Sequence, residues 1–160
     1  MSGASTPPSR DGWAQTGWAR LSGPAHPPPS VKLLQAGAIA AGAAVVVNLV
    51  LWGIGRAAGV DFEVTQPDGS QVVVGAGAVI SQSLTAILAG TLLLWPMTRL
   101  PAGLLVWVLI AVFVGLGSLI FPLSRANHPS TALTLALMHL VAFAAVLALP
   151  ARVAYRAGEI

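Results

Sequence analysis

The sequence predicts an all-α membrane protein: a four-helix transmembrane bundle with a short extracytoplasmic β-hairpin between the first two helices. The 160-residue chain is 56% hydrophobic and only 8% charged, against roughly 25% charged residues in an average soluble domain. Its apolar residues lie in four long blocks without Asp, Glu, Lys or Arg, and a helix needs about 20 such residues to cross a bilayer. The lipid bilayer therefore takes the place of a large protein core.

The first 32 residues precede the first apolar block and are rich in Pro, Gly and Ser. A segment of this composition buries too little apolar surface to offset the entropy of ordering it, so we expect a disordered cytoplasmic tail at 1–32. Within it, Trp13, Trp18 and Leu21 could rest at the membrane interface, which tryptophan favours. The tail is not expected to be a cleavable signal peptide, because the first apolar block begins near Leu33 and is too long.

The four blocks form the predicted transmembrane domain at 33–150, which is followed by a short cytoplasmic tail at 151–160. Pro101 suits a helix start, because its missing N–H would be unpaired there. Pro122 and Pro150 are expected to end the third and fourth helices. The predicted spans are 33–55, 75–95, 102–121 and 130–149.

The loop between the first two spans differs from the other connections. An alternating stretch at 61–65 and a β-branched stretch at 71–74 flank the turn sequence Gln66-Pro-Asp-Gly-Ser70. This pattern is typical of a β-hairpin. An irregular loop is the alternative, because an isolated hairpin is marginally stable in water.

The distribution of basic residues predicts the orientation in the membrane. With four spans, six Arg and Lys residues fall on the side of both termini and two fall on the other side. The positive-inside rule then places both termini in the cytoplasm and the hairpin outside. We therefore expect a multi-pass membrane protein with both termini in the cytoplasm. The six are Arg10, Arg20, Lys32, Arg99, Arg152 and Arg156, and the two are Arg56 and Arg125.

The composition argues against several classes of function. The chain has no cysteine, and no carboxylate lies within a predicted span, so a thiol nucleophile, an acid pair and a catalytic triad are not expected. Of the three histidines, His26 is predicted to lie across the membrane from His128 and His139, which leaves no metal site. The basic residues are scattered singly, which argues against nucleic acid as a partner. No cofactor is expected.

Polar residues gather in the outer half of the predicted bundle. They are Asn48, Ser81, Gln82, Ser83, Ser118, Thr134 and His139. Polar groups that face lipid are costly, so we expect these side chains to turn inward and bond one another. One interpretation is a structural network that sets the register of the helices. The other is a shallow outward-facing pocket for a polar or lipid-headgroup ligand, with Asn48, Gln82, Ser83 and His139 as its floor and Arg125 near its mouth.

His139 is the only ionisable side chain well inside a predicted span, and such residues are functional candidates. A neutral imidazole that bonds within the core is the alternative.

Several short stretches resemble a known family. They are Asn48-Leu-Val-Leu-Trp52, Gly55, Gly59-Val-Asp-Phe62 and His139-Leu-Val141. Together they are similar to an uncharacterised group of small four-helix membrane proteins from actinobacteria, a domain of unknown function, over about residues 33–150. The resemblance implies the four-helix fold and a plasma-membrane location. It implies no activity and no catalytic residues.

The leading functional hypothesis is a non-enzymatic membrane protein that acts as an accessory subunit or a homo-oligomer, with the lipid bilayer and a membrane protein or a second copy as partners. Small residues four positions apart, as at Ala86 and Gly90 or Ala111 and Gly115, allow close helix contact and favour this hypothesis. The alternative is a small transporter or channel with a polar outward-facing site. A lipid-modifying enzyme is the third hypothesis.

Overall fold

The computed structural model describes residues 30–157 and confirms the predicted fold class. Four helices in this part of the chain are long and apolar enough to cross a membrane. A two-stranded antiparallel hairpin lies between the first and second of them. The tail predicted at 1–32, with its interfacial Trp13–Leu21 segment, lies almost entirely outside the described residues.

The bundle consists of four long helical segments, one of which is interrupted. They are α2 (Ser30–Ala57), α3 (Ala76–Met97), α4 (Gly103–Ser118) with the short α5 (Ile120–Arg125), and α6 (Pro129–Ala157). All four segments extend beyond the predicted spans, and Pro122 and Pro150 do not end the third and fourth of them as the sequence predicts. Pro122 lies in the first turn of α5, where a missing N–H costs little. Pro150 lies inside α6, directly after the apolar span that ends at Leu149.

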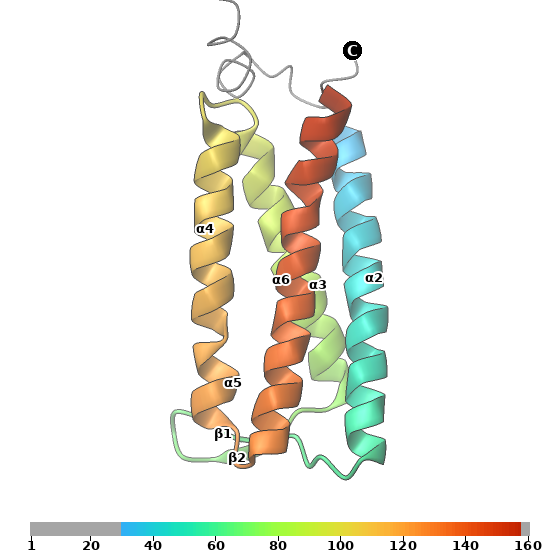
Figure 1. Ribbon diagram of the computed structural model, residues 1–160, viewed down its shortest axis with the longest axis vertical. Helices are drawn as coiled ribbons and strands as arrows, with labels where there is room; N and C mark the ends of the chain where they lie inside the picture. The colour runs from blue at the N-terminus through green and yellow to red at the C-terminus, as the bar shows by residue number, and fades with distance from the viewer. Residues whose placement is uncertain (1–29, 158–160) are drawn as a thin grey trace, which may run out of the picture.

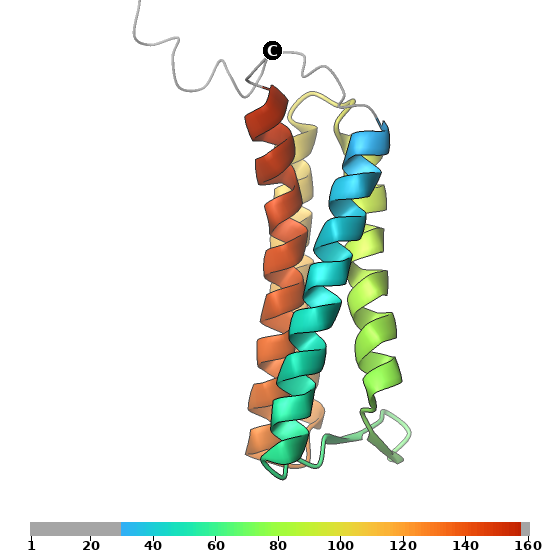
Figure 2. The ribbon, with the colours of Figure 1, turned by 90° about the vertical axis from the view of Figure 1, so that its right-hand side faces the viewer.

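The helices are arranged so that α4 is peripheral (Figures 1 and 2). Helix α2 packs against α3 and α6, whereas α4 packs against α3 and α6 on the other side of the bundle. Only 6% of the most apolar stretch of α4–α5 is buried inside the protein, against 28% of that of α3. The start of α2 and the end of α6 lie at one end of the bundle, and the hairpin lies at the other end.

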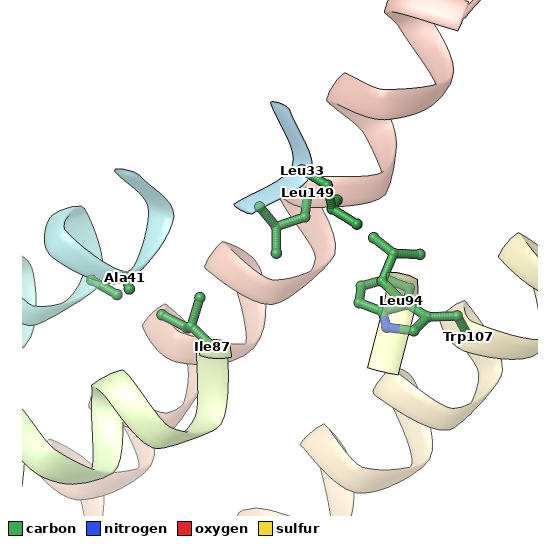
Figure 3. Close-up of a cluster of buried hydrophobic side chains, with 7 residues drawn as sticks. Leu33, Ala41, Ile87, Leu94, Trp107 and Leu149 are labelled. Carbon is green, nitrogen blue, oxygen red and sulfur yellow. The ribbon is translucent and has the colours of Figure 1, made fainter. Parts of the chain in front are cut away.

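The main core lies in the half of the bundle away from the hairpin (Figure 1), and its side chains are drawn in Figure 3. It contains Leu33, Ala41, Ala44, Ile87, Leu94, Trp107 and Leu149. Lipid is as apolar as these side chains, so close packing rather than water exclusion must hold the helices together. At Gly37 the approach of α2 to α3 is so close that an added Cβ would lie 2.6 Å from Oγ1 of Thr91.

The hairpin pairs β1 (Glu63–Thr65) with β2 (Gln71–Val73), in the register Glu63↔Val73. Its turn requires a left-handed residue, which Gly69 supplies with φ of 84°.

A second apolar cluster anchors the hairpin to the bundle. Phe62 is fully buried in it, and its ring lies so close to Gly55 that an added Cβ would be 2.7 Å from Cζ. Phe62 also packs near Trp52, with ring centroids 6.2 Å apart. The Trp52 indole N–H donates a hydrogen bond to the carbonyl of Val74, at 3.0 Å. These contacts connect both ends of the loop to α2, which explains why a hairpin of only three-residue strands is ordered.

Polar contacts join the hairpin to the start of α6. The Thr131 hydroxyl donates to Asp61 at 2.6 Å, and His128 lies 3.3 Å from the other oxygen of the same carboxyl. The hydrogen bond from Thr131 is the largest cause that holds the pKa of Asp61 below its ordinary value, and the bond from the backbone N–H of Glu63 comes next. The Thr65 hydroxyl donates to the side chain of Asn127 at 2.7 Å, so the hairpin is fastened to the far side of the bundle as well.

Candidate functional site

A groove of about 610 Å³ lies between α3, α4 and α6. Its volume falls within the range of roughly 300–1,000 Å³ that is usual for sites that bind small molecules. The residues from α4 and α6 that line it recur at three- and four-residue spacing, so each helix contributes one continuous face. From α4 these are Trp107, Ile110, Ala111, Val114, Gly115 and Ser118, and from α6 they are Leu135, Met138, His139, Ala142, Phe143 and Val146.

The groove exists because α3 diverges from α4 along the length of the bundle. This helix lies beside α4 near their short connection and beside α2 near the hairpin (Figure 1), so α3 and α4 diverge. Small residues such as Ala86, Ala89 and Ala142 line the groove and leave its volume open. Ala86 and Ala89 are exposed, so the groove opens towards the surrounding lipid rather than being enclosed.

The two ends of the groove differ in chemistry. Leu93, Val146 and Trp107 line the end away from the hairpin. There the indole N–H of Trp107 donates to the carbonyl of Gly90 at 2.9 Å, which fastens α4 to α3. The polar lining residues lie nearer the hairpin and include Asn48, Gln82 and His139. No charged residue among those described at 30–157 lines the groove.

Asn48 is a buried polar residue at the polar end, with 3% of its surface exposed. Its amide N–H donates to the hydroxyl of Ser83 at 3.0 Å, which joins α2 to α3. Its carbonyl oxygen Oδ1 is buried without a hydrogen-bond partner in the described part of the chain. An orphaned buried acceptor typically costs about 1–3 kcal/mol, so a ligand that donates to Oδ1 would recover part of this free energy.

His139 contributes a second acceptor. Its Nδ1 lies 2.8 Å from the carbonyl oxygen of Leu135, one turn earlier in α6. A carbonyl oxygen only accepts, so Nδ1 carries the proton. In the neutral ring Nε2 is then an acceptor, on the side of the ring away from the helix backbone.

A smaller cavity of about 110 Å³ lies under the hairpin and extends the polar end of the groove. Gln82 and His139 line both cavities, as do Val74 and Leu135. The smaller cavity also touches Gln66, Val72 and Val73 of the hairpin. The hairpin therefore covers the polar end of the groove.

The structure brings four of the five sequence-predicted site residues to one groove. Asn48, Gln82, Ser83 and His139 all line it. Arg125 ends α5 and lines neither cavity.

The interhelical polar network expected from the sequence is reduced to the bond between Asn48 and Ser83. Ser118 and Thr134 donate instead to carbonyls of their own helices, at 2.7 and 2.8 Å, and Ser81 also bonds within its helix. Short hydroxyl side chains readily form such local bonds, which competes with bonding across helices.

Trp107 was not among the site residues predicted from the sequence. It is the only tryptophan in a nearly uniform apolar block, and a buried indole N–H needs an acceptor. That requirement predicts a partner on another helix, although it does not identify Gly90.

A family model matches residues 28–156, which is most of the chain. The chain belongs to the family of unknown function DUF6069. This confirms the resemblance to an uncharacterised family. No curated protein and no solved structure matches the chain. The region matched to DUF6069 includes all four spans, the hairpin and every residue of the groove. The protein is thus a multi-pass membrane protein of this family.

Proposed function

We propose that this protein binds a membrane-soluble molecule in the groove between α3, α4 and α6, and that it acts by binding rather than by catalysis. The observation that carries the proposal is the groove itself, with a volume of about 610 Å³, apolar along most of its length and polar at the hairpin end. This is the arrangement expected for a ligand with an apolar body and a small polar head.

The route of entry follows from the packing of α4. This helix is the least buried of the four, and small, exposed residues of α3 form the opposite side of the groove. A ligand dissolved in the bilayer could therefore enter sideways between the two helices without passing through water.

The proposal includes an orientation and a location. The excess of Arg and Lys on the side of the termini favours cytoplasmic termini in a plasma membrane. The hairpin and the polar end of the groove would then face the outer leaflet. Along α3, Gln82 lies about 9 Å from Ala76, and a hydrocarbon core is about 30 Å thick. The head of the ligand would then lie within the outer half of the hydrocarbon, about a third of its thickness from the outer boundary.

The test is retention of a ligand by purified full-length protein. Ala142→Phe places a ring in the groove from α6, because Ala142 lines it. Ala144→Phe is the matched control, because Ala144 lies two residues away on the same helix, is exposed, and does not line the groove. Native mass spectrometry after exchange into mild detergent measures the lipid-sized molecules that remain bound.

The wild type and Ala144→Phe should retain an apolar ligand, and Ala142→Phe should lose most of it. Equal retention by all three proteins, or no retained ligand in any of them, would show that the groove is not a binding site.

A second candidate is the accessory or homo-oligomeric role predicted from the sequence. Gly53 and Ala57 are exposed and four residues apart on α2, and an added Cβ at Gly53 would meet nothing within 4 Å. Such a face allows another helix to approach closely. Photo-crosslinking with p-benzoylphenylalanine at two positions separates the candidates. Adducts with lipid at Ala89, which lines the groove, support the groove, and adducts with a second copy at Gly53 support the oligomer.

A further inference from the structure

We infer that the groove recognises the free hydroxyl group of a neutral, long-chain membrane alcohol. This inference rests on the proposed function and specifies the class of ligand. The candidates include glycerolipids with a free hydroxyl and polyprenols, which share a hydroxyl attached to a long apolar body.

The polar end of the groove presents hydrogen-bond acceptors. Oδ1 of Asn48 is unpartnered within residues 30–157 but has almost no accessible surface, so a donor reaches it only when neighbouring side chains move. The proton on Nδ1 of His139 leaves Nε2 as a second acceptor. Both residues line the groove, together with Gln82, whose amide can donate as well as accept. A ligand that satisfies these two acceptors must bring a donor, and a hydroxyl group brings one donor and two acceptor lone pairs.

The charge of the lining selects against ionic heads. Arg, Lys, Asp and Glu are all absent from the lining among the described residues. A phosphate or carboxylate buried here would lack a cation to compensate for the loss of water, and such a burial is very costly. The ligand is therefore uncharged at the end that it inserts.

The apolar part of the groove accommodates a chain. From Ser81 to Leu93 the lining of α3 spans about 18 Å at 1.5 Å per residue, and apolar residues of α4 and α6 face it along this length. The ligand would lie along the helices with its hydroxyl towards the hairpin and its chain towards Trp107.

The experiment compares alcohols with their own methyl ethers. Full-length protein in nanodiscs is labelled with a photoreactive diazirine derivative of hexadecanol, and unlabelled probes compete for the site. The probes are geranylgeraniol, 1,2-dioleoylglycerol and the methyl ether of each. An ether keeps the chain and an oxygen acceptor but has no donor.

Wild-type protein should prefer each alcohol that fits over its ether by roughly tenfold, the factor that corresponds to one buried hydrogen bond of about 1.4 kcal/mol. A preference confined to geranylgeraniol or to dioleoylglycerol would identify the source of the hydroxyl.

Three variants test which residues form hydrogen bonds with the hydroxyl group of the ligand. Asn48→Leu and His139→Leu should each weaken the binding of the alcohols and leave the binding of the ethers unchanged. The ratio of alcohol to ether binding should then fall towards one. Thr134→Ala is the control, because Thr134 lies on the same helix as His139, lines neither cavity, and donates its hydroxyl proton to the carbonyl of Ser130 at 2.8 Å. Its ratio should stay within twofold of the wild-type ratio.

The outcomes separate the two proposals. If alcohols and ethers compete equally well, the groove binds apolar molecules but the recognition of a hydroxyl is wrong. If neither class competes, the proposed function fails as well. If Asn48→Leu and His139→Leu still bind the ethers and both keep the wild-type ratio of alcohol to ether binding, the two acceptors do not recognise the hydroxyl.

Discussion

The contact between α2 and α3 at Gly37 provides a sharp test of the packing. A Cβ added at Gly37 would lie 2.6 Å from Oγ1 and 2.7 Å from Cγ2 of Thr91, whereas ordinary contacts begin near 3.4 Å. Thr91 is 1% exposed, and its hydroxyl donates to the carbonyl of Ile87 at 2.8 Å, which holds the side chain in place. The two helices would therefore have to separate by most of an ångström in the variant Gly37→Ala.

The expected cost follows from two opposing effects. Overpacking of this kind destabilises by about 1–3 kcal/mol, and the better helix propensity of alanine returns up to about 1 kcal/mol. We expect Gly37→Ala to lower the free energy of unfolding by about 1–2 kcal/mol. Gly42→Ala on the same helix is the control, because an added Cβ there meets nothing within 4 Å, and it should be neutral or slightly stabilising.

A double-mutant cycle identifies the cause. Thr91→Ala removes Oγ1 and Cγ2 and leaves only Cβ, which lies 3.1 Å from the added atom. The double variant should therefore be more stable than the sum of the single effects predicts, by about 1–2 kcal/mol. Unfolding in mixed micelles with increasing sodium dodecyl sulfate, followed by tryptophan fluorescence, measures all four proteins. Additive effects, or a Gly37→Ala variant as stable as Gly42→Ala, would refute the close packing.

Three further predictions concern the hairpin and α4. Phe62→Ala should release the hairpin, since replacing a fully buried Phe costs about 3–5 kcal/mol, and amide hydrogen exchange should rise at 63–73 but not in α2. The pKa of Asp61 is lowered in the folded state, so its stabilisation is present above the unfolded value of about 3.9 and is lost as the pH falls through the folded pKa. Amide hydrogen exchange in the hairpin, corrected for its intrinsic pH dependence, should therefore rise as the pH falls below about 3.9. Asp61→Asn should remove most of this rise. Trp107→Phe keeps a ring but removes the bond to Gly90, which should cost about 0.6 kcal/mol and speed exchange at 98–102, and unchanged exchange would contradict the role of this bond.

The fold could be predicted because its main signals are local in sequence. A block without charge and about 20 residues long is a span whatever it packs against, and Pro-Asp-Gly favours a turn on its own. The ends of the helices were harder to predict from the sequence. Pro122 and Pro150 look like terminators in the sequence, but whether a proline ends a helix depends on what the surrounding helices supply.

The candidate site could be predicted only in part. The depth of Asn48, Gln82 and His139 along their helices follows from a rise of 1.5 Å per residue, which is why these residues were grouped correctly. Whether a hydroxyl bonds across helices or to its own helix depends on rotamers and helix rotation, so the behaviour of Ser118 and Thr134 was not predictable. The groove itself depends on the divergence of α3 from α4, which no residue pattern specifies.

The fastening of the hairpin to the other side of the bundle has a consequence for the order of assembly. Val64 forms a bridge with Ala126, and Asp61 bonds Thr131 seventy residues later in the chain. During synthesis these partners do not yet exist when the hairpin is made, and they reach its side of the membrane only after the third span has crossed. The contacts of the loop to α2 can form first, whereas the bond to Thr131 forms only with the last helix, so that bond marks the completion of the whole bundle.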